Sequence, residues 1–420
     1  MMNTNLTNDT KTIILLCGVF GKDRSIKPLT PKEYTLLVKW LVKREKRPEF
    51  LLADENLREA SKDTGLELSR LISLLGRGVQ LGFAIEEWHR NGIWIISRSD
   101  NDYPSRYKRK LKDSAPPILY GVGERSLLNA GGLAVVGSRK IDYPGEEFTR
   151  DVAERCVKDG ISIISGGAKG VDQISMSSAI GSGGSAVGVL ADNLLKKSLE
   201  RTSRIAIQEN RLLLISPYNP NARFMVGTAM ARNKLIYALA DFSLVVTSEY
   251  KKGGTWSGAI EELKRENSIP VFVQKATPEI KGNGKLILEG AFEWPENFSS
   301  DQITEQLKMI ADGKRKIPPP QTLDMFDSKI KNKNKFGRDT TKSTIENSSL
   351  SDRETTKEFQ NNIYDVVLPL ILSKLSSPKD IETLSQELEV EESQLRIWLT
   401  KATKAGDVAK HFRPVRYSRI

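Results

Sequence analysis

The stretch LAVVGSR, residues 133–139, decides the fold class of this 420-residue chain. Four consecutive apolar residues that end at Gly137 are typical of a parallel strand covered on both faces. Similar short runs predict further strands at residues 161–164, 186–190, 212–215, 242–246 and 271–273. Helices fit between them, around residues 171–180, 230–240 and 257–266. This alternation predicts an α/β fold with a doubly wound parallel sheet. Ligands of such sheets bind beyond the carboxyl ends of the strands.

Four glycine-rich or basic segments fall next to predicted loops of this sheet: GSR at 137–139, SGGAKGVD at 165–172, RNK at 232–234 and KGGTWSGA at 252–259. Glycine lets a backbone approach an anion closely, and amides at a helix start favour phosphate. Arginine can bind phosphate through two parallel hydrogen bonds. We therefore predict one composite anion cleft, with a surface arginine, a solvated helix face and tight connections as the simpler alternatives for the single segments.

Carboxylates near these loops have two interpretations. Asp172 can cap a helix or take part in catalysis, and capping is favoured. Glu261 and Glu262 can act as acids or bases or complete a helix, and the helix is favoured. Neither a dinucleotide fingerprint nor a Walker A sequence is present, so neither site is predicted.

The whole chain is expected to divide into four parts. Residues 1–110 show helical periodicity, with Thr30 and Pro31 as a helix start and residues 68–75 as a second helix. Residues 111–300 form the α/β core. Residues 301–359 contain a basic, Ser-, Thr- and Asn-rich linker. Residues 360–420 predict three helices and a hairpin, the arrangement of a winged helix.

Composition narrows the functional classes. Lys and Arg exceed Asp and Glu by 64 − 53 = +11, which favours a polyanionic partner. Two cysteines and two histidines are too few for a disulfide framework or a zinc site. The longest early apolar run is too short to cross a bilayer and lacks a cleavage site, so we expect no membrane association and a cytoplasmic protein. No metal and no cofactor are predicted.

The motifs resemble the DprA (Smf) DNA-processing family. They occur in the family's order: DYP at 102–104, PPILYG at 116–121, VGSR at 136–139, SGGAKGVD at 165–172 and RNKLI at 232–236. The resemblance implies an extended Rossmann-like fold and a non-enzymatic protein that binds single-stranded DNA in a basic pocket. It also implies homodimerisation and delivery of strands to a RecA-type recombinase in natural transformation or DNA recombination.

The positions that we assign to single-stranded DNA binding come from these motifs and from the glycine loop that follows them. Phe224 matches a family phenylalanine, and Lys196 and Lys197 lie where the family has basic residues. Phe224, Tyr218, Tyr237 and Trp256 are candidate base stackers. The assigned residues are Gly137, Ser138, Arg139, Gly166, Gly167, Lys169, Gly170, Phe224, Arg232, Asn233, Lys234, Gly253, Gly254 and Thr255.

Two departures from the family pattern support an alternative. Met176 stands where the family has a histidine, and the loop at 253–258 (GGTWSG) replaces the family's SGSLIT sequence. That loop is similar to those of lysine-decarboxylase-like, nucleotide-binding members of the superfold. The alternative is a nucleotide-binding or nucleotide-hydrolysing enzyme or sensor, with Glu261 or Glu262 as acid or base. For the C-terminal part, contact with DNA and docking of a protein both remain open.

Overall fold

The computed structural model describes residues 6–21, 25–275, 281–298, 302–315, 363–388, 390, 392–411 and 415–419. The chain divides into two compact units, Met1–Leu323 and Asp324–Ile420, and each has its own core. The boundary expected at residue 110 lies inside the first unit. The limits of the four expected parts remain predictions. Within the described residues, no helix is long and apolar enough to cross a membrane.

The first unit begins with helices that pack around one apolar core. The predicted start of α2 is confirmed: the Thr30 hydroxyl accepts from the Glu33 amide, and the Glu33 carboxylate accepts from the Thr30 amide. Leu37, Leu71 and Trp88 are buried between the helices. The elements are α1 (Asn8–Cys17), α2 (Pro31–Lys43), the 3-10 helix η1 (Pro48–Leu52), α3 (Asp54–Thr64), α4 (Leu68–Leu75) and α5 (Gly78–Arg90).

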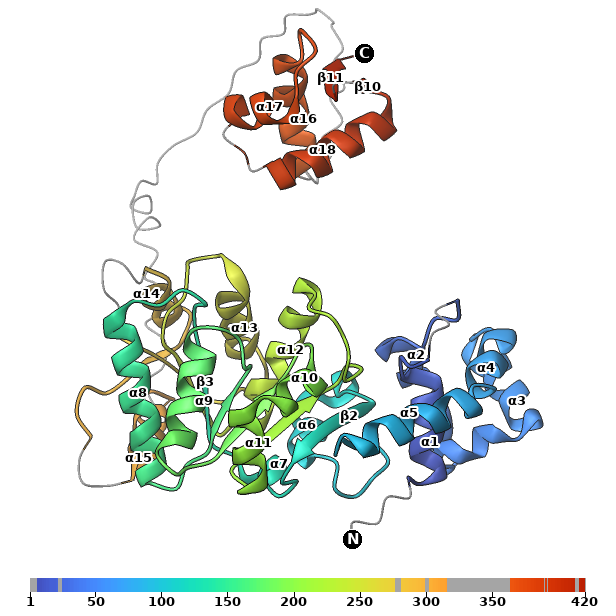
Figure 1. The fold of residues 1–420 in the computed structure, drawn as a ribbon, viewed down its shortest axis with the longest axis vertical. Helices are drawn as coiled ribbons and strands as arrows, with labels where there is room; N and C mark the ends of the chain where they lie inside the picture. Colours follow the sequence, from blue (N-terminus) through green and yellow to red (C-terminus); the bar gives the residue numbers. More distant parts are fainter. Residues whose placement is uncertain are drawn as a thin grey trace, which may run out of the picture. The chain divides into compact units, whose positions relative to one another are not determined.

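A nine-stranded sheet forms the centre of this unit (Figure 1). Its strands are β1 (Trp94–Ser97), β2 (Ile118–Gly123), β3 (Leu133–Val136), β4 (Ile163–Ser165), β5 (Ala186–Val189), β6 (Leu212–Ser216), β7 (Phe242–Val245), β8 (Val271–Val273) and β9 (Phe292–Glu293). Their order is β1-β2-β6-β5-β4-β3-β7-β8-β9. Strands β3 to β9 are parallel, as predicted, whereas β1 and β2 add an antiparallel edge. The order reverses between β3 and β7, which makes this point the topological switch point.

Helices cover both faces of the sheet. One face packs against α8 (Tyr143–Lys158), α9 (Val171–Gly181), α10 (Leu194–Leu199), α11 (Arg201–Gln208), α15 (Ile303–Arg315) and the N-terminal helices. The other packs against α6 (Ser105–Leu111), α7 (Leu127–Ala130), α12 (Val226–Leu239), α13 (Gly253–Leu263) and α14 (Lys281–Leu288), with the short η2 (Lys112–Ser114) after α6. The strands are buried on both sides, as their continuous apolar sequences require.

Three helix positions differ from the sequence-based prediction. Helix α15 occupies the start of the predicted linker, because Ile303, Leu307 and Ala311 recur at helical spacing and are buried. Helix α12 begins at Val226 rather than near residue 230, and α13 begins at Gly253 rather than at 257. Gly253 and Gly254 therefore lie in the first turn of α13, and not in a loop before the helix. The rest of the predicted linker lies outside the described residues.

The C-terminal unit contains α16 (Ile363–Lys374), α17 (Ile381–Leu388), α18 (Glu392–Ala405) and the antiparallel strands β10 (Val408–His411) and β11 (Arg416–Arg419). The order of three helices and a hairpin agrees with the predicted winged helix. Leu384, Leu399 and Val408 are among its buried residues. The backbone of Lys379 exchanges two hydrogen bonds with that of Tyr417, which ties the hairpin to the start of α17.

Candidate functional site

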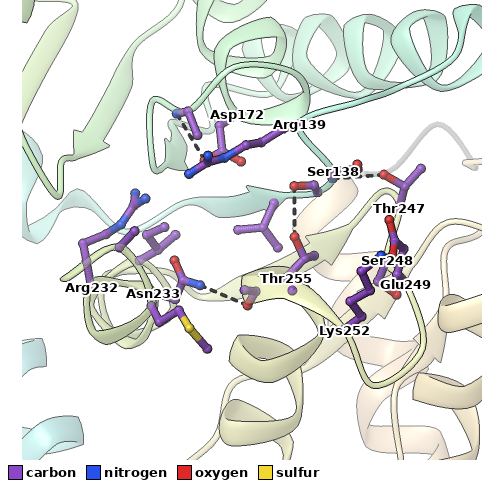
Figure 2. A pocket seen from close by; sticks show the side chains of 18 of the residues that line it. Ser138, Arg139, Asp172, Arg232, Asn233, Thr247, Ser248, Glu249, Lys252 and Thr255 are labelled. Carbon is purple, nitrogen blue, oxygen red and sulfur yellow. Dashed lines mark hydrogen bonds and ion pairs between the residues drawn. The ribbon is translucent and has the colours of Figure 1, made fainter. Parts of the chain in front are cut away.

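Two hollows lie at the carboxyl edge of the sheet. We call the first the switch-point cavity: it has a volume of about 360 Å³ and lies where β3 and β7 end (Figure 2). We call the second the basic groove: it has a volume of about 490 Å³ and lies beyond β4 and β5. Arg139, Ala168, Phe224 and Arg232 line both hollows. The two hollows are therefore neighbours with a shared wall.

The turn after β3 and the loop after β4 fit together because both contain glycine. A Cβ atom on Gly137 would lie 2.4 Å from the Val171 side chain, and one on Gly170 would lie 2.4 Å from the Ser138 carbonyl. Gly170 also has φ = +89°, which disfavours other residues. The Ser138 amide donates to the Thr247 hydroxyl at 3.1 Å, and the Thr255 hydroxyl donates to the Gly137 carbonyl at 3.0 Å. These contacts hold Arg139 at the sheet edge.

Arg232 is the buried cation of the site. Its side chain is only 5% exposed, and one guanidinium nitrogen donates to the Val189 carbonyl at the end of β5. Burial lowers the pKa of Arg232, while the nearby carboxylates of Asp172 and Asp192 oppose that shift. The Arg232 Nε has no hydrogen-bond partner within the described residues. A Cβ atom on Gly166 would lie 1.8 Å from this guanidinium, so glycine makes the space that Arg232 fills.

Arg139 and Phe224 form the exposed part of the shared wall. The Arg139 guanidinium lies 4.9 Å from the centre of the Phe224 ring, within the range of a cation–π interaction. Phe224 is 45% exposed. An exposed aromatic face beside a guanidinium can stack on an unpaired base.

Five cationic side chains line the basic groove: Arg139, Lys169, Lys196, Lys197 and Arg232. They come from the turn after β3, the loop after β4, helix α10 and helix α12, which are separated by up to 93 positions in the sequence. The acidic residues in its lining are Asp192 and Glu200, and Glu200 is paired with Lys197 at 3.1 Å. The groove therefore carries a surplus of positive charge.

The switch-point cavity has the N-terminus of α13 at one end. Gly253, Gly254 and Thr255 line it, and Lys252, the N-cap residue, makes no side-chain capping hydrogen bond. Asn233 fixes this turn, since its side-chain amide donates to the Gly254 carbonyl at 3.0 Å. The positive end of an α-helix favours an anion here.

Most of the residues assigned from the sequence lie together, but not all. Gly137, Ser138, Arg139, Phe224, Arg232, Asn233, Gly253, Gly254 and Thr255 line the switch-point cavity, and Gly166, Gly167 and Lys169 line the basic groove. Lys234 does not join them: it lines a separate hollow with Lys110, Glu261 and Arg265. Residues two positions apart point to different sides of a helix, so Arg232 and Lys234 do not share one face. Gly170 supports the loop by packing against Ser138.

The carboxylates have structural roles. Glu262 is fully buried, its carboxylate accepts from the Ile269 amide at 3.0 Å, and burial raises its pKa. Glu261 lines the hollow of Lys234, so neither residue lines the switch-point cavity, contrary to the enzymatic alternative. Asp172 is buried and accepts from the Ala168 amide, so it braces the loop from the first turn of α9. The favoured capping role is wrong, because Gly170 is the N-cap residue and no side chain caps this helix. Burial also raises the pKa of Asp172, against the effect of Arg232.

Of the candidate stackers, Phe224 alone lies exposed at the site. Trp256 is buried and packs against Tyr250 at 5.1 Å, and the Tyr218 hydroxyl donates to the Thr228 carbonyl. Tyr237 is 1% exposed and is one of the residues that line the switch-point cavity.

Sequence reasoning missed one segment of the site. Thr247, Ser248 and Glu249 line the switch-point cavity directly after β7. The rule that ligands bind beyond strand ends points to this segment, but its composition is ordinary. Buried Asn283 on α14 positions it, because the Ser248 hydroxyl donates to the Asn283 side chain and Asn283 donates to the Val246 carbonyl.

Comparisons with known proteins agree with this architecture. The family model described as DNA recombination-mediator protein A matches residues 94–308. The protein Smf of Synechocystis is 29% identical over 222 residues, which cover 49% of this chain and 53% of that relative. The DNA processing protein DprA of Bacillus subtilis is 26% identical over 227 residues, covering 52% of this chain and 73% of the relative. The chain thus spans about half the length of the Synechocystis relative.

One solved structure supports the fold. DNA processing protein A of Streptococcus pneumoniae superimposes with a TM-score of 0.54 and 20% sequence identity, covering 69% of this chain and 95% of that one.

Proposed function

Because the chain belongs to the DNA recombination-mediator protein A family, which includes DprA and Smf, we propose that it binds single-stranded DNA in the basic groove. The observation that carries this proposal is the convergence of Arg139, Lys169, Lys196, Lys197 and Arg232 on one hollow at the carboxyl edge of the sheet. Lys and Arg side chains on such a surface displace the counterions that are condensed on the DNA phosphates, and this release provides sequence-independent affinity.

The exposed ring of Phe224 supports a single strand over a duplex. Its face lies beside Arg139 at the wall of the groove, and stacking needs a base that is not already paired. Base–aromatic stacking tolerates any sequence, since every base has a flat face. Strand binding without sequence preference is therefore the expected activity.

The wider role that the family resemblance implies belongs to the same proposal. We infer that the protein forms a homodimer, that it passes its bound strand to a RecA-type recombinase, and that it works by binding without catalysis. Sedimentation tests the dimer, and strand exchange on DNA coated with single-strand-binding protein tests delivery. Loss of recombinase loading with strand binding intact would locate delivery elsewhere in the chain.

Replacing Arg139 tests strand binding. Arg139→Ala removes a phosphate contact, so affinity should fall equally for all sequences, and the slope of log affinity against log salt should become shallower by about 0.7. Fluorescence anisotropy with labelled single strands at several salt concentrations measures both quantities.

Lys234→Ala is the matched control. It removes a cation only two residues from Arg232 in the same helix, but one that lines a different hollow, so both affinity and salt slope should stay unchanged. Equal behaviour of the Arg139 variant and the wild type would contradict the proposal.

A further inference from the structure

Two residues that line the switch-point cavity each carry a buried polar atom that has no hydrogen-bond partner within the described residues. These atoms are Nε of Arg232, which is 5% exposed, and the hydroxyl of Tyr237, which is 1% exposed. Both residues line this cavity, and Tyr237 does not line the basic groove. Leaving a buried donor unpaired is costly, so a ligand with acceptor atoms would relieve that cost.

The two ends of the cavity differ in chemistry. At one end lie apolar side chains from the start of α12: Phe224, Val226, Ala229 and Met230. Phe224 is 45%, Val226 is 66% and Met230 is 43% exposed, and exposed apolar side chains grouped at one hollow are a common mark of a binding site. A flat, partly apolar group such as a nucleobase suits this end.

The other end suits an anion. Helix α13 is eleven residues long, starts with Gly253, Gly254 and Thr255 at the cavity, and has no side-chain cap. Lys252 adds a cation there, although Glu249 pairs with it at 3.1 Å. Free first-turn amides and the positive end of the helix are the arrangement that binds phosphate.

Because one end of the switch-point cavity is apolar and the other favours an anion, we infer that the cavity binds a nucleoside 5′-monophosphate group. The phosphate lies at the start of α13 and the base lies against the start of α12. The cavity volume of about 360 Å³ falls within the range for small-molecule sites, roughly 300–1,000 Å³. Arg232 and Tyr237 contact the middle of the ligand. This inference goes beyond strand binding in the basic groove, because it assigns a separate ligand to a separate hollow.

The same chemical group has two sources: a free mononucleotide, or the 5′-phosphorylated end of a DNA strand. Calorimetry with the full chain compares deoxyadenosine monophosphate, deoxyadenosine and inorganic phosphate. Competition then compares one oligonucleotide sequence with a 5′-phosphate, with a 5′-hydroxyl and as a circle. Binding of the monophosphate over the nucleoside supports a free ligand, and preference for the 5′-phosphorylated strand supports a strand end.

Two pairs of variants link the binding to the cavity. Ala229→Trp fills the apolar end, whereas Ala231→Trp puts the same side chain on the exposed part of the same helix. Tyr237→Phe removes an unpartnered hydroxyl from the cavity lining, whereas Tyr120→Phe removes one that is buried elsewhere. We expect Ala229→Trp to weaken monophosphate or 5′-end binding more than about tenfold, and Tyr237→Phe about three- to tenfold, as for one lost hydrogen bond. Neither control variant, Ala231→Trp or Tyr120→Phe, should change this affinity.

The outcomes separate this inference from the proposed function. If circular and 5′-phosphorylated strands bind equally and no monophosphate binds, the inference is wrong while strand binding stands. If the monophosphate binds but Ala229→Trp has no effect, the ligand lies elsewhere and the inference is wrong as well. If no strand binds while the monophosphate binds and Ala229→Trp abolishes it, the proposed function fails and the inference holds.

Discussion

A single missing atom at Gly166 determines where Arg232 lies. Any other residue would place Cβ within 1.8 Å of the Arg232 guanidinium, and the arginine is buried among the ends of β4 and β5. A substitution at this glycine therefore acts on one of the two cations that line both hollows. Sequence reasoning assigned both residues to the site but could not pair them, because 66 positions separate them and their contact depends on the fold.

We expect Gly166→Ala to displace the Arg232 side chain. The overpacked site should lower the free energy of unfolding by about 1–3 kcal/mol, and strand affinity should fall with it. Urea denaturation and fluorescence anisotropy measure the two effects. Gly181→Ala is the control, since a Cβ atom there would have no neighbour within 4 Å. Equal affinity of the Gly166 variant and the wild type would show that the position of Arg232 is unimportant for binding.

At the scale of elements, helix starts explain where the prediction was accurate and where it was not. The start of α2 was predicted to the residue, because Thr30, Pro31 and Glu33 have local roles that any helix start uses. The starts of α12 and α13 were placed four residues too late. Both segments contain glycine near their first turn, and glycine disfavours helix locally, so tertiary packing decides.

Glu33 gives an element-scale prediction for acid stability. Its hydrogen bond with Arg70 of α4, together with the Thr30 amide, lowers its pKa to about 2 from 4.5. A carboxylate with a lowered pKa stabilises the fold above its unfolded value and loses that effect as the pH falls towards the folded value. Glu33→Gln should therefore cost ~1 kcal/mol of unfolding free energy at neutral pH, as for a lost cap.

The difference between wild type and Glu33→Gln should shrink as the pH falls from 4.5 to about 2. Chemical denaturation at a series of pH values follows it. Glu55→Gln, an exposed acid in the first turn of α3, should show little change at any pH. A constant difference for Glu33→Gln across this range would mean that the carboxylate charge contributes nothing.

At the scale of the whole molecule, the sequence predicted strand positions better than strand pairing. The parallel strands follow from continuous apolar runs between helices. The antiparallel pairing of β2 with β6 joins segments about 90 positions apart, and no local pattern specifies its direction. The site was predictable to the extent that it lies in loops after strands. Its division into two hollows was not, because that depends on how Arg139 packs on Phe224.

The separate cores of the two compact units lead to a prediction for the entire chain. Leu399→Ala leaves a cavity in the core of the C-terminal unit and should destabilise that unit by about 2–5 kcal/mol. Calorimetry should show a lower unfolding temperature for the C-terminal unit and an unchanged unfolding temperature for the first unit. Strand affinity should stay within about twofold of the wild type, as binding in the basic groove requires. A parallel loss of affinity would mean that the C-terminal unit contributes to strand binding.

Arg139 belongs to both hollows, yet it has one guanidinium. A phosphate that draws this group to one side removes it from the other. Two anions held on opposite sides of the same residue would then antagonise each other without touching, and thermodynamic reciprocity requires each to weaken the other by the same factor. The side chain that joins the two hollows is thus also the point at which their occupants would compete.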